Sequence, residues 1–225
     1  HSTAVDILRQ LVDLFITGSA DIDRNQHLRD RRDLGELLFF DLDRPADARP
    51  HFEAVRRGDP DGLGADRMVL SALETIYKEE GNTDGRADIL RARLEHASSD
   101  DKRETYCMLL AQLHWESERD AERAEHWLDE ILNQDPTHEG AHRLYAEIAR
   151  SRGDSASAAN HLESVLEVAG EGLDAVEIER ELAQLQLDHL DRPEDARIHF
   201  EHVLDQSPGD ARALEGLQAC HRATG

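Results

Sequence analysis

The stretch most suggestive of chemistry is HEGAH, residues 138 to 142. It matches H-E-x-x-H, a pattern in which two histidines one helical turn apart bind zinc beside a glutamate that serves as general base. A catalytic zinc site also needs a third ligand, and nothing in the spacing places His161 or Glu163 convincingly in that role. His138 follows an Asp-Pro dipeptide, so we expect a helix to start near Glu139. We interpret the motif as a helix start and keep a zinc enzyme as a remote alternative.

A second candidate metal site is DIDRNQHLRDRR, residues 21 to 32, which begins like a calcium-binding loop. Aspartate or asparagine occupies its first, third and fifth positions, as a calcium loop requires. The sixth position should be glycine and is Gln26, and the twelfth should be glutamate and is Arg32. We therefore interpret this segment as a helix cap followed by a charged first turn.

No other pattern argues for catalysis. The sequence contains neither a phosphate-binding G-x-x-x-x-G-K-[ST] nor a nucleophile motif G-x-S-x-G. Gly58, Gly62 and Gly64 fall in a turn between helical segments, not after a strand. The prediction is a protein that is not an enzyme and that uses no metal or cofactor.

The charge balance limits the classes of partner. The 225 residues include 49 acidic and 26 basic ones, a formal net charge of −23, and only Lys78 and Lys102 are lysines. Such a surface repels phosphate backbones, so we expect no nucleic-acid partner. Adaptation to a salty cytoplasm and an arginine-biased genome both remain open as explanations.

Compartment and membrane association follow from a few further features. Cys107 and Cys220 have no C-x-x-C spacing, which favours a reducing compartment. The longest apolar-rich segment, AVDILRQLVDLFI, carries charges and is too short to span a bilayer. No signal peptide is visible, and the chain starts at His1 without an initiator methionine. We expect a cytoplasmic protein without membrane contact, and a chain that is part of a longer one.

The positions of these motifs follow from an internal repeat. LDRPADARPHFEAV at 42 to 55 and LDRPEDARIHFEHV at 190 to 203 are identical at 11 of 14 positions. Extending them outward yields five copies in one register, counting a degenerate second copy. A reference position near the start of the second half of each copy recurs at spacings of 38, 38, 34 and 38 residues, at Ala48, Arg86, Ala124, Ala158 and Ala196.

Each copy is predicted to form two amphipathic helices joined by a short polar turn. The second half carries apolar residues at i, i+4, i+7 and i+8, as at Ala124, Leu128, Ile131 and Leu132. The first half carries a leucine followed by a small residue in three copies. Three copies close on a proline, and several have one extra residue between the helices.

The chain resembles the tetratricopeptide repeat (TPR) family over about residues 24 to 211. The resemblance lies in alanine, a large apolar residue and proline in the second half, as in Ala48/Phe52/Pro60, Ala124/Leu128/Pro136 and Ala196/Phe200/Pro208. The chain departs from the pattern at Arg86, where alanine is expected, and at Pro50, which we expect to kink its helix.

The resemblance implies an all-α fold, a right-handed α-solenoid of about five TPR helix pairs, about twelve helices in all and no sheet. An extra helix at 3 to 17 precedes the first pair, and a last helix covers the final pair. We expect a single domain with an N-terminal helix in 1–22, repeats at 23–63, 64–100, 101–137, 138–172 and 173–209, and a capping helix at 210–225.

The resemblance also implies a binding face, because the first helix of each TPR pair lines the inner surface of the solenoid. Arginine and aromatic residues, which often anchor interfaces, recur at those positions. The predicted partner-binding residues are Arg32, Glu36, Phe39, Phe40, Lys78, Gln112, Trp115, Arg143, Glu147, Arg150, Arg180 and Gln184.

The predicted function is a protein-interaction scaffold whose concave groove binds a peptide or helix with acidic and apolar residues. The opposing interpretation of the groove is that Phe39 and Trp115 are buried by the next repeat and that the arginines pair with nearby glutamates. An alternative function is structural, with exposed apolar ends joining copies of the chain into a homodimer or a larger assembly.

Overall fold

The structure is a computed structural model that describes residues 6–10, 13, 23–59, 61–169 and 173–225. Most of the helix expected at 3 to 17 lies outside these residues. The described residues are helices joined by turns, and they contain no strand. The helices are α2 (Arg24–Glu36), α3 (Pro45–Gly58), α4 (Arg67–Glu79), α5 (Thr83–Glu95), α6 (Asp100–Leu113), α7 (Ala121–Gln134), α8 (Glu139–Ser151), α9 (Ser155–Ala169), α10 (Leu173–Asp188), α11 (Pro193–Gln206) and α12 (Ala211–Thr224).

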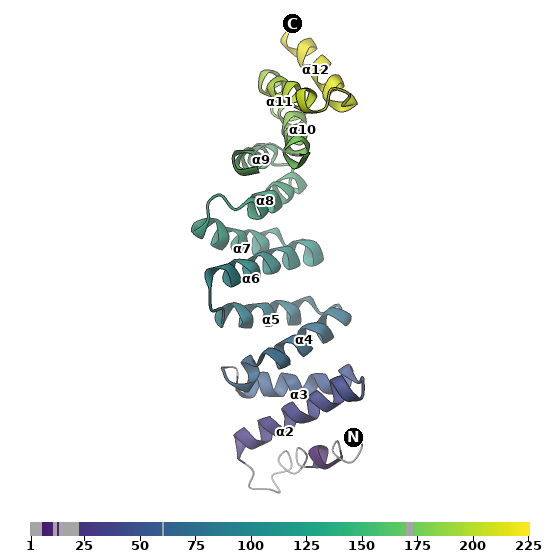
Figure 1. Ribbon diagram of the computed structural model, residues 1–225, viewed down its shortest axis with the longest axis vertical. Coiled ribbons are helices and arrows are strands. Elements are labelled where there is room, and N and C mark those ends of the chain that lie inside the picture. Colours follow the sequence, from purple (N-terminus) through teal and green to yellow (C-terminus); the bar gives the residue numbers. More distant parts are fainter. Residues whose placement is uncertain (1–5, 11–12, 14–22, 60, 170–172) are drawn as a thin grey trace. The chain divides into compact units, whose positions relative to one another are not determined.

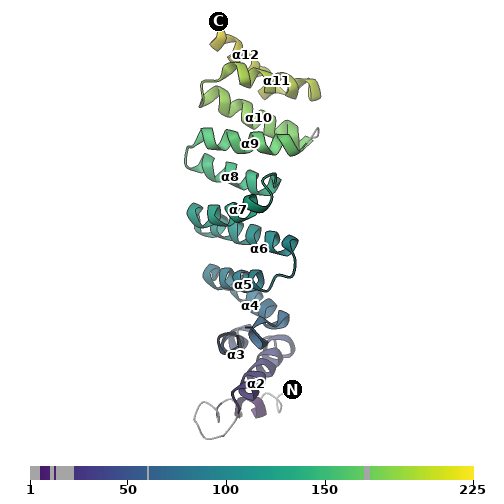
Figure 2. The same ribbon diagram turned by 90° about the vertical axis from the view of Figure 1, so that its left-hand side faces the viewer.

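The helices divide into two compact units, His1–Leu113 and His114–Gly225. Within each unit, every helix from α2 onward lies beside the next one along the chain (Figures 1 and 2). The connections are short, which favours antiparallel neighbours. The pairs α2/α3 and α4/α5 belong to the first unit, and α8/α9 and α10/α11 belong to the second. None of the described helices combines the length and the apolar character that crossing a bilayer would require.

The extra residue predicted between the helices of several copies is absorbed by a wide turn. In the first, third and fifth copies one residue adopts a left-handed conformation, with φ of 52° to 53°. The next backbone N–H reaches back six residues, as from Arg44 to the carbonyl oxygen of Leu38 at 2.8 Å. In the first and third copies a five-residue π-helical turn, Leu37–Asp41 and His114–Glu118, comes before the left-handed residue, which is how helices accommodate one inserted residue. The left-handed residues are Asp43, Arg119 and Asp191.

The second and fourth copies use a narrower turn with glycine. Gly81 and Gly153 have φ of 66° and 75°, and the following N–H reaches back only five residues. This is the ordinary glycine-terminated end of an α-helix. Wide and narrow turns therefore alternate along the chain.

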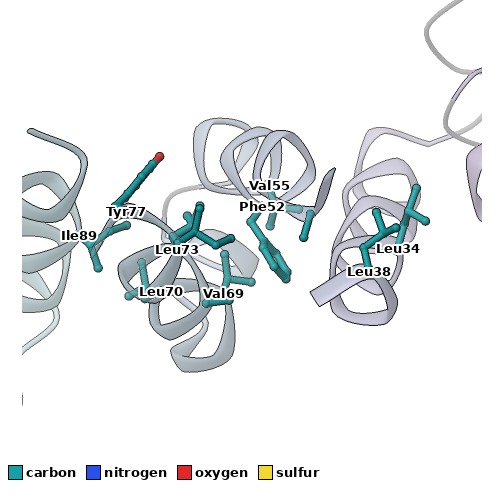
Figure 3. Close-up of a cluster of buried hydrophobic side chains, with 12 residues drawn as sticks. Leu34, Leu38, Phe52, Val55, Val69, Leu70, Leu73, Tyr77 and Ile89 are labelled. Atoms are coloured by element: carbon teal, nitrogen blue, oxygen red, sulfur yellow. The ribbon is translucent and has the colours of Figure 1, made fainter. Parts of the chain in front are cut away.

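A core cluster of the first unit is built from apolar side chains of α2 to α5 (Figure 3). Leu34 of α2, Phe52 of α3 and Leu73 of α4 are fully buried. Burial of such a side chain stabilises the fold by about 1.5 to 3 kcal/mol relative to exposure. The small residue of the first helix allows this packing, because a Cβ added at Gly35 would lie 2.8 Å from the Phe52 ring.

The second unit repeats this arrangement with other residues. Phe200 of α11 is fully buried, and a Cβ added at Gly216 of α12 would lie 2.3 Å from its ring. Leu162 of α9 and Leu182 of α10 belong to a neighbouring cluster. Cys220 is buried, as is Cys107 in the first unit.

Pro50 does not end its helix. The α3 helix runs for 14 residues through Pro50, the same length as α11, which has Ile198 at the matching position. The backbone thus tolerates the proline, although a proline inside a helix lacks one hydrogen bond.

Candidate functional site

The first histidine of HEGAH closes a helix terminus. His138 is the N-cap of α8, and its Nδ1 accepts a hydrogen bond from the Ala141 N–H at 2.9 Å. This bond satisfies one of the amide groups that every helix start leaves without an intrahelical partner.

The second histidine of HEGAH links two helices. The Nε2 of His142 lies 2.9 Å from the carbonyl oxygen of Pro136, so it carries the proton. Its Nδ1 then accepts from the Nδ1–H of His161 on α9, at 2.9 Å. Burial, and secondly the nearby His142, lower the pKa of His161. The ring of Tyr145 stacks on His161 at 4.6 Å, which completes a packed polar contact within the second unit.

The calcium-like segment is also helical. The α2 helix begins at Arg24, the fourth position of the supposed loop, and continues through its end. Gln26 donates to the carboxylate of Asp30 at 2.9 Å, one turn along the helix. Across the described part of the chain, no group of three or more His, Cys, Asp or Glu side chains is placed to hold a metal ion.

In the first unit, the predicted partner-binding residues differ in exposure. Arg32 lies 3.4 Å from Glu36 and 3.5 Å from Asp66, so carboxylates already surround its guanidinium. Phe40 is 60% exposed and meets Phe39 edge to face, while Phe39 also contacts the core. Lys78 on α4 and Gln112 on α6 are exposed.

In the second unit, Trp115 is buried, with 4% of its surface exposed. Its Nε1–H donates to Glu147 of α8 at 2.6 Å, and the Arg119 guanidinium lies 4.8 Å above its ring. The indole is therefore a packed side chain that leaves little area for a partner, whereas Glu147 is exposed.

The predicted arginines of the second unit pair with carboxylates, as the opposing interpretation expected. Arg143 lies 2.8 Å from Glu139, one turn earlier on α8. Arg150 of α8 pairs with Glu181 of α10. Arg180 pairs with Glu177 and, at 2.8 Å, with Asp210. Asp210 is the N-cap of α12, so this last ion pair joins α10 to the start of α12.

Three of the predicted residues, Arg150, Arg180 and Gln184, nevertheless meet in one cavity of about 380 Å³. The cavity lies among α8, α10 and α12, so it is formed by the first helices of successive pairs and the helix that follows the last pair. Its lining residues are Arg150, Glu177, Arg180, Glu181, Gln184, Leu185, His189 and Arg212.

Arg212 lines this cavity although it was not among the predicted binding residues, because 210–225 was assigned only as a capping helix. Among the described residues, no carboxylate pairs with the exposed Arg212. The first turn of α12 takes the place that the next repeat's first helix would hold. Continuing the repeat register past the fifth copy would have predicted Arg212 as a residue of the binding face.

The sequence matches no protein-family model and no curated protein. The structure is similar to that of YrrB, a TPR protein with an unusual peptide-binding site, with a TM-score of 0.50 and 12% identity over 84% of this chain and 91% of that one. It is also similar to TTC0263, a TPR protein of Thermus thermophilus, with a TM-score of 0.39 and 20% identity over 88% of this chain and 98% of that one. A third similar structure is PilF of Pseudomonas aeruginosa, with a TM-score of 0.44 and 14% identity over 95% of this chain and 96% of that one.

The repeat register, the helix pairs of both units and the likeness to YrrB all indicate the same fold. The chain has the all-α helical repeat fold of the tetratricopeptide repeat proteins.

Proposed function

We propose that this chain is a protein-interaction scaffold that binds a peptide or helix of a partner protein, without catalysis. The observation that carries the proposal is the cavity among α8, α10 and α12, where three predicted residues and Arg212 meet. The fold supports it, since YrrB is a TPR protein with a peptide-binding site.

The cavity offers two kinds of contact to a peptide. Arg212 provides a guanidinium with no carboxylate partner among the described residues, and such a fork binds a carboxylate through two hydrogen bonds. Arg150 is held by Glu181, so a partner carboxylate would have to share or replace that contact. Leu185 provides apolar surface in the same cavity. We infer a partner segment with both acidic and apolar side chains.

Self-association is the second candidate function, and exposed apolar side chains favour it. Phe40 is 60% exposed and Ile198 is 59% exposed. A concentration-dependent dimer in multi-angle light scattering would support this role, and its loss in a Phe40→Ser/Ile198→Ser variant would locate the contact.

The test of partner binding is a quantitative pull-down from the source lysate. The variant Arg150→Glu/Arg212→Glu reverses two charges in the cavity. The matched control Arg192→Glu/Arg197→Glu makes the same charge change at solvent-accessible positions outside it. Circular dichroism should show equal helicity for all three proteins.

We expect the cavity variant to lose one specific partner by tenfold or more, because each lost charge-assisted hydrogen bond is worth about 1.5 to 3 kcal/mol. The control should retain that partner. If both variants capture it equally well, the cavity is not the binding site, and the proposal in this form is wrong.

A further inference from the structure

The first unit holds a cavity of its own, of about 410 Å³, which none of the predicted partner-binding residues lines. Cavities of this size fall within the range that binds small ligands or single side chains. It lies at the start of α4, the end of α5 and the start of α6. Its lining residues are Ala65, Arg67, Leu70, Ser71, Arg93, His96, Ala97, Lys102 and Tyr106.

Among the residues that the structure describes, three cations and a histidine line this cavity and no carboxylate does. This is unusual in a chain with 49 acidic residues and a net charge of −23. The cavity of the second unit has a different balance, because Glu177 and Glu181 line it and pair with two of its arginines.

Two of the three cations lack a carboxylate partner among the described residues. Lys102 donates to the neutral Ser98 hydroxyl at 3.0 Å, and Arg67 makes no ion pair there. Only Arg93 is neutralised, by Glu74 at 2.8 Å. Arg67 and Lys102 therefore leave positive charge uncompensated at this cavity.

Neutral hydrogen-bond donors complete the lining. The Ser71 hydroxyl accepts from Arg93 at 3.1 Å, and its own proton remains available. The half-buried Tyr106 has a hydroxyl without a hydrogen-bond partner in the described structure. Anions prefer such sites, where fixed charges and hydroxyl donors converge.

The acidic groups nearest in the sequence do not fill the cavity. Asp66 caps the first turn of α4 and lies 3.5 Å from Arg32. Asp100 and Asp101 are exposed in the first turn of α6 and are not lining residues. Among the described residues no carboxylate neutralises Arg67 or Lys102, which leaves both cations available to a carboxylate of another molecule.

We propose that this cavity is an anion-binding site that takes the carboxylate side chains of an acidic peptide segment. The proposal rests on the proposed function only in that the ligand is part of a protein partner. The strongly acidic surface repels a long polyanion, whereas a short acidic cluster can reach a local basic cavity. Arg67 and Lys102 provide the charge, and Ser71 and Tyr106 provide additional donors.

The test uses the full chain and a fluorescein-labelled hexaglutamate with an amidated C-terminus, followed by fluorescence anisotropy at low salt. The variant Arg67→Gln/Lys102→Gln removes the two uncompensated cations. The matched control Arg57→Gln/Arg91→Gln removes two solvent-accessible cations of the same unit that lie outside the cavity. None of the four residues is buried, so the substitutions leave the core unchanged.

We expect the cavity variant to bind hexaglutamate at least about tenfold more weakly, since charge-assisted hydrogen bonds are about twice as strong as neutral ones. The control should change the Kd by no more than about twofold, as rim charges usually do. Equal weakening in both variants would show binding that follows net charge alone and would overturn the proposal. Absence of hexaglutamate binding to the unmodified chain would also overturn it.

Two further arms separate the remaining outcomes. Inorganic phosphate should displace hexaglutamate only weakly; displacement by phosphate at the same concentration as hexaglutamate would point to a small oxyanion instead of a peptide. The Arg150→Glu/Arg212→Glu variant should keep its hexaglutamate binding. Loss of binding in that variant would place the acidic peptide in the second unit, against this proposal and in favour of the proposed function.

Discussion

The twin segments 42–55 and 190–203 belong to different units and adopt the same backbone. The residue before each second helix has φ and ψ of −122° and 66° at Arg44 and of −119° and 63° at Arg192. Alanine, phenylalanine and valine at matching positions are fully buried in both segments. Local sequence and the pairing of neighbouring helices are therefore enough to specify the repeat.

The twins differ in what surrounds one shared histidine. The pKa of His51 is lowered to about 4. Burial is the main cause, and the nearby cations Arg31 and Arg9 lower it further. Burial also lowers the pKa of His199, but nearby carboxylates, with Glu179 foremost, oppose that change. The same residue in the same backbone thus has different electrostatics, because the neighbours come from helices outside the twin segments.

The largest expected effect tests the shared core. Phe52→Ala and Phe200→Ala should each lower the free energy of unfolding by about 3 to 5 kcal/mol, because each removes a buried ring and leaves a cavity beside a glycine-containing helix. Urea denaturation followed by circular dichroism measures both. If one substitution costs less than half as much as the other, the two cores are not equivalent.

The second effect concerns one position in the helices of the twin segments, where α3 has Pro50 and α11 has Ile198. Ile198→Pro should lower the free energy of unfolding by about 3 kcal/mol, because proline removes a hydrogen bond inside α11 while the exposed Ile198 contributes little to the core. Pro50→Ile should raise it by about 1 to 3 kcal/mol for the converse reason. Denaturation of both reciprocal variants checks this, and a destabilising Pro50→Ile would mean that α3 depends on its proline.

The third effect concerns pH. A histidine whose folded pKa lies below its unfolded value of 6.5 binds more protons when unfolded, so its contribution to stability is present at neutral pH and is lost as pH falls. For His51 this loss extends from about pH 6.5 to about 4. His51→Gln should therefore reduce the acid sensitivity of unfolding more than His199→Gln does.

NMR titration of the ring protons supplies the direct measurement for this comparison. The His51 ring should titrate near pH 4, below the His199 ring. The stability difference between each variant and the unmodified chain isolates the histidine from the carboxylates, which also titrate in acid. Equal pKa values for the two rings would contradict the role assigned to Arg31 and Arg9.

The smallest expected effect distinguishes the wide from the narrow turns. Gly153→Ala should lower the free energy of unfolding by about 1 kcal/mol through backbone strain alone, since no heavy atom lies within 4 Å of the added Cβ. Asp191→Ala should lower the free energy of unfolding by less, because the aspartate already adopts the left-handed conformation with a Cβ in place. Thermal unfolding of both variants tests the order; a larger loss for Asp191→Ala would indicate a side-chain contribution to the wide turn.

The repeat, the helix pairing and the positions of buried alanine and phenylalanine could be predicted from the sequence, because they depend on periodicity within a few turns of helix. The interpretation of HEGAH as a helix start could also be predicted, and His138 confirms it as the N-cap of α8. The α3 helix continues through Pro50, and the kink expected there stays a prediction.

Tertiary structure alone decided which charges remain uncompensated. Sequence spacing placed Arg150 and Arg180 on a common face, but the folded chain supplies Glu181 and Asp210 to pair with them. Packing in the first unit gathers Arg67 and Lys102 at one cavity that no carboxylate of the described residues lines. These two ion pairs join residues about 30 positions apart on different helices, so only the contact between neighbouring helices determines the partner.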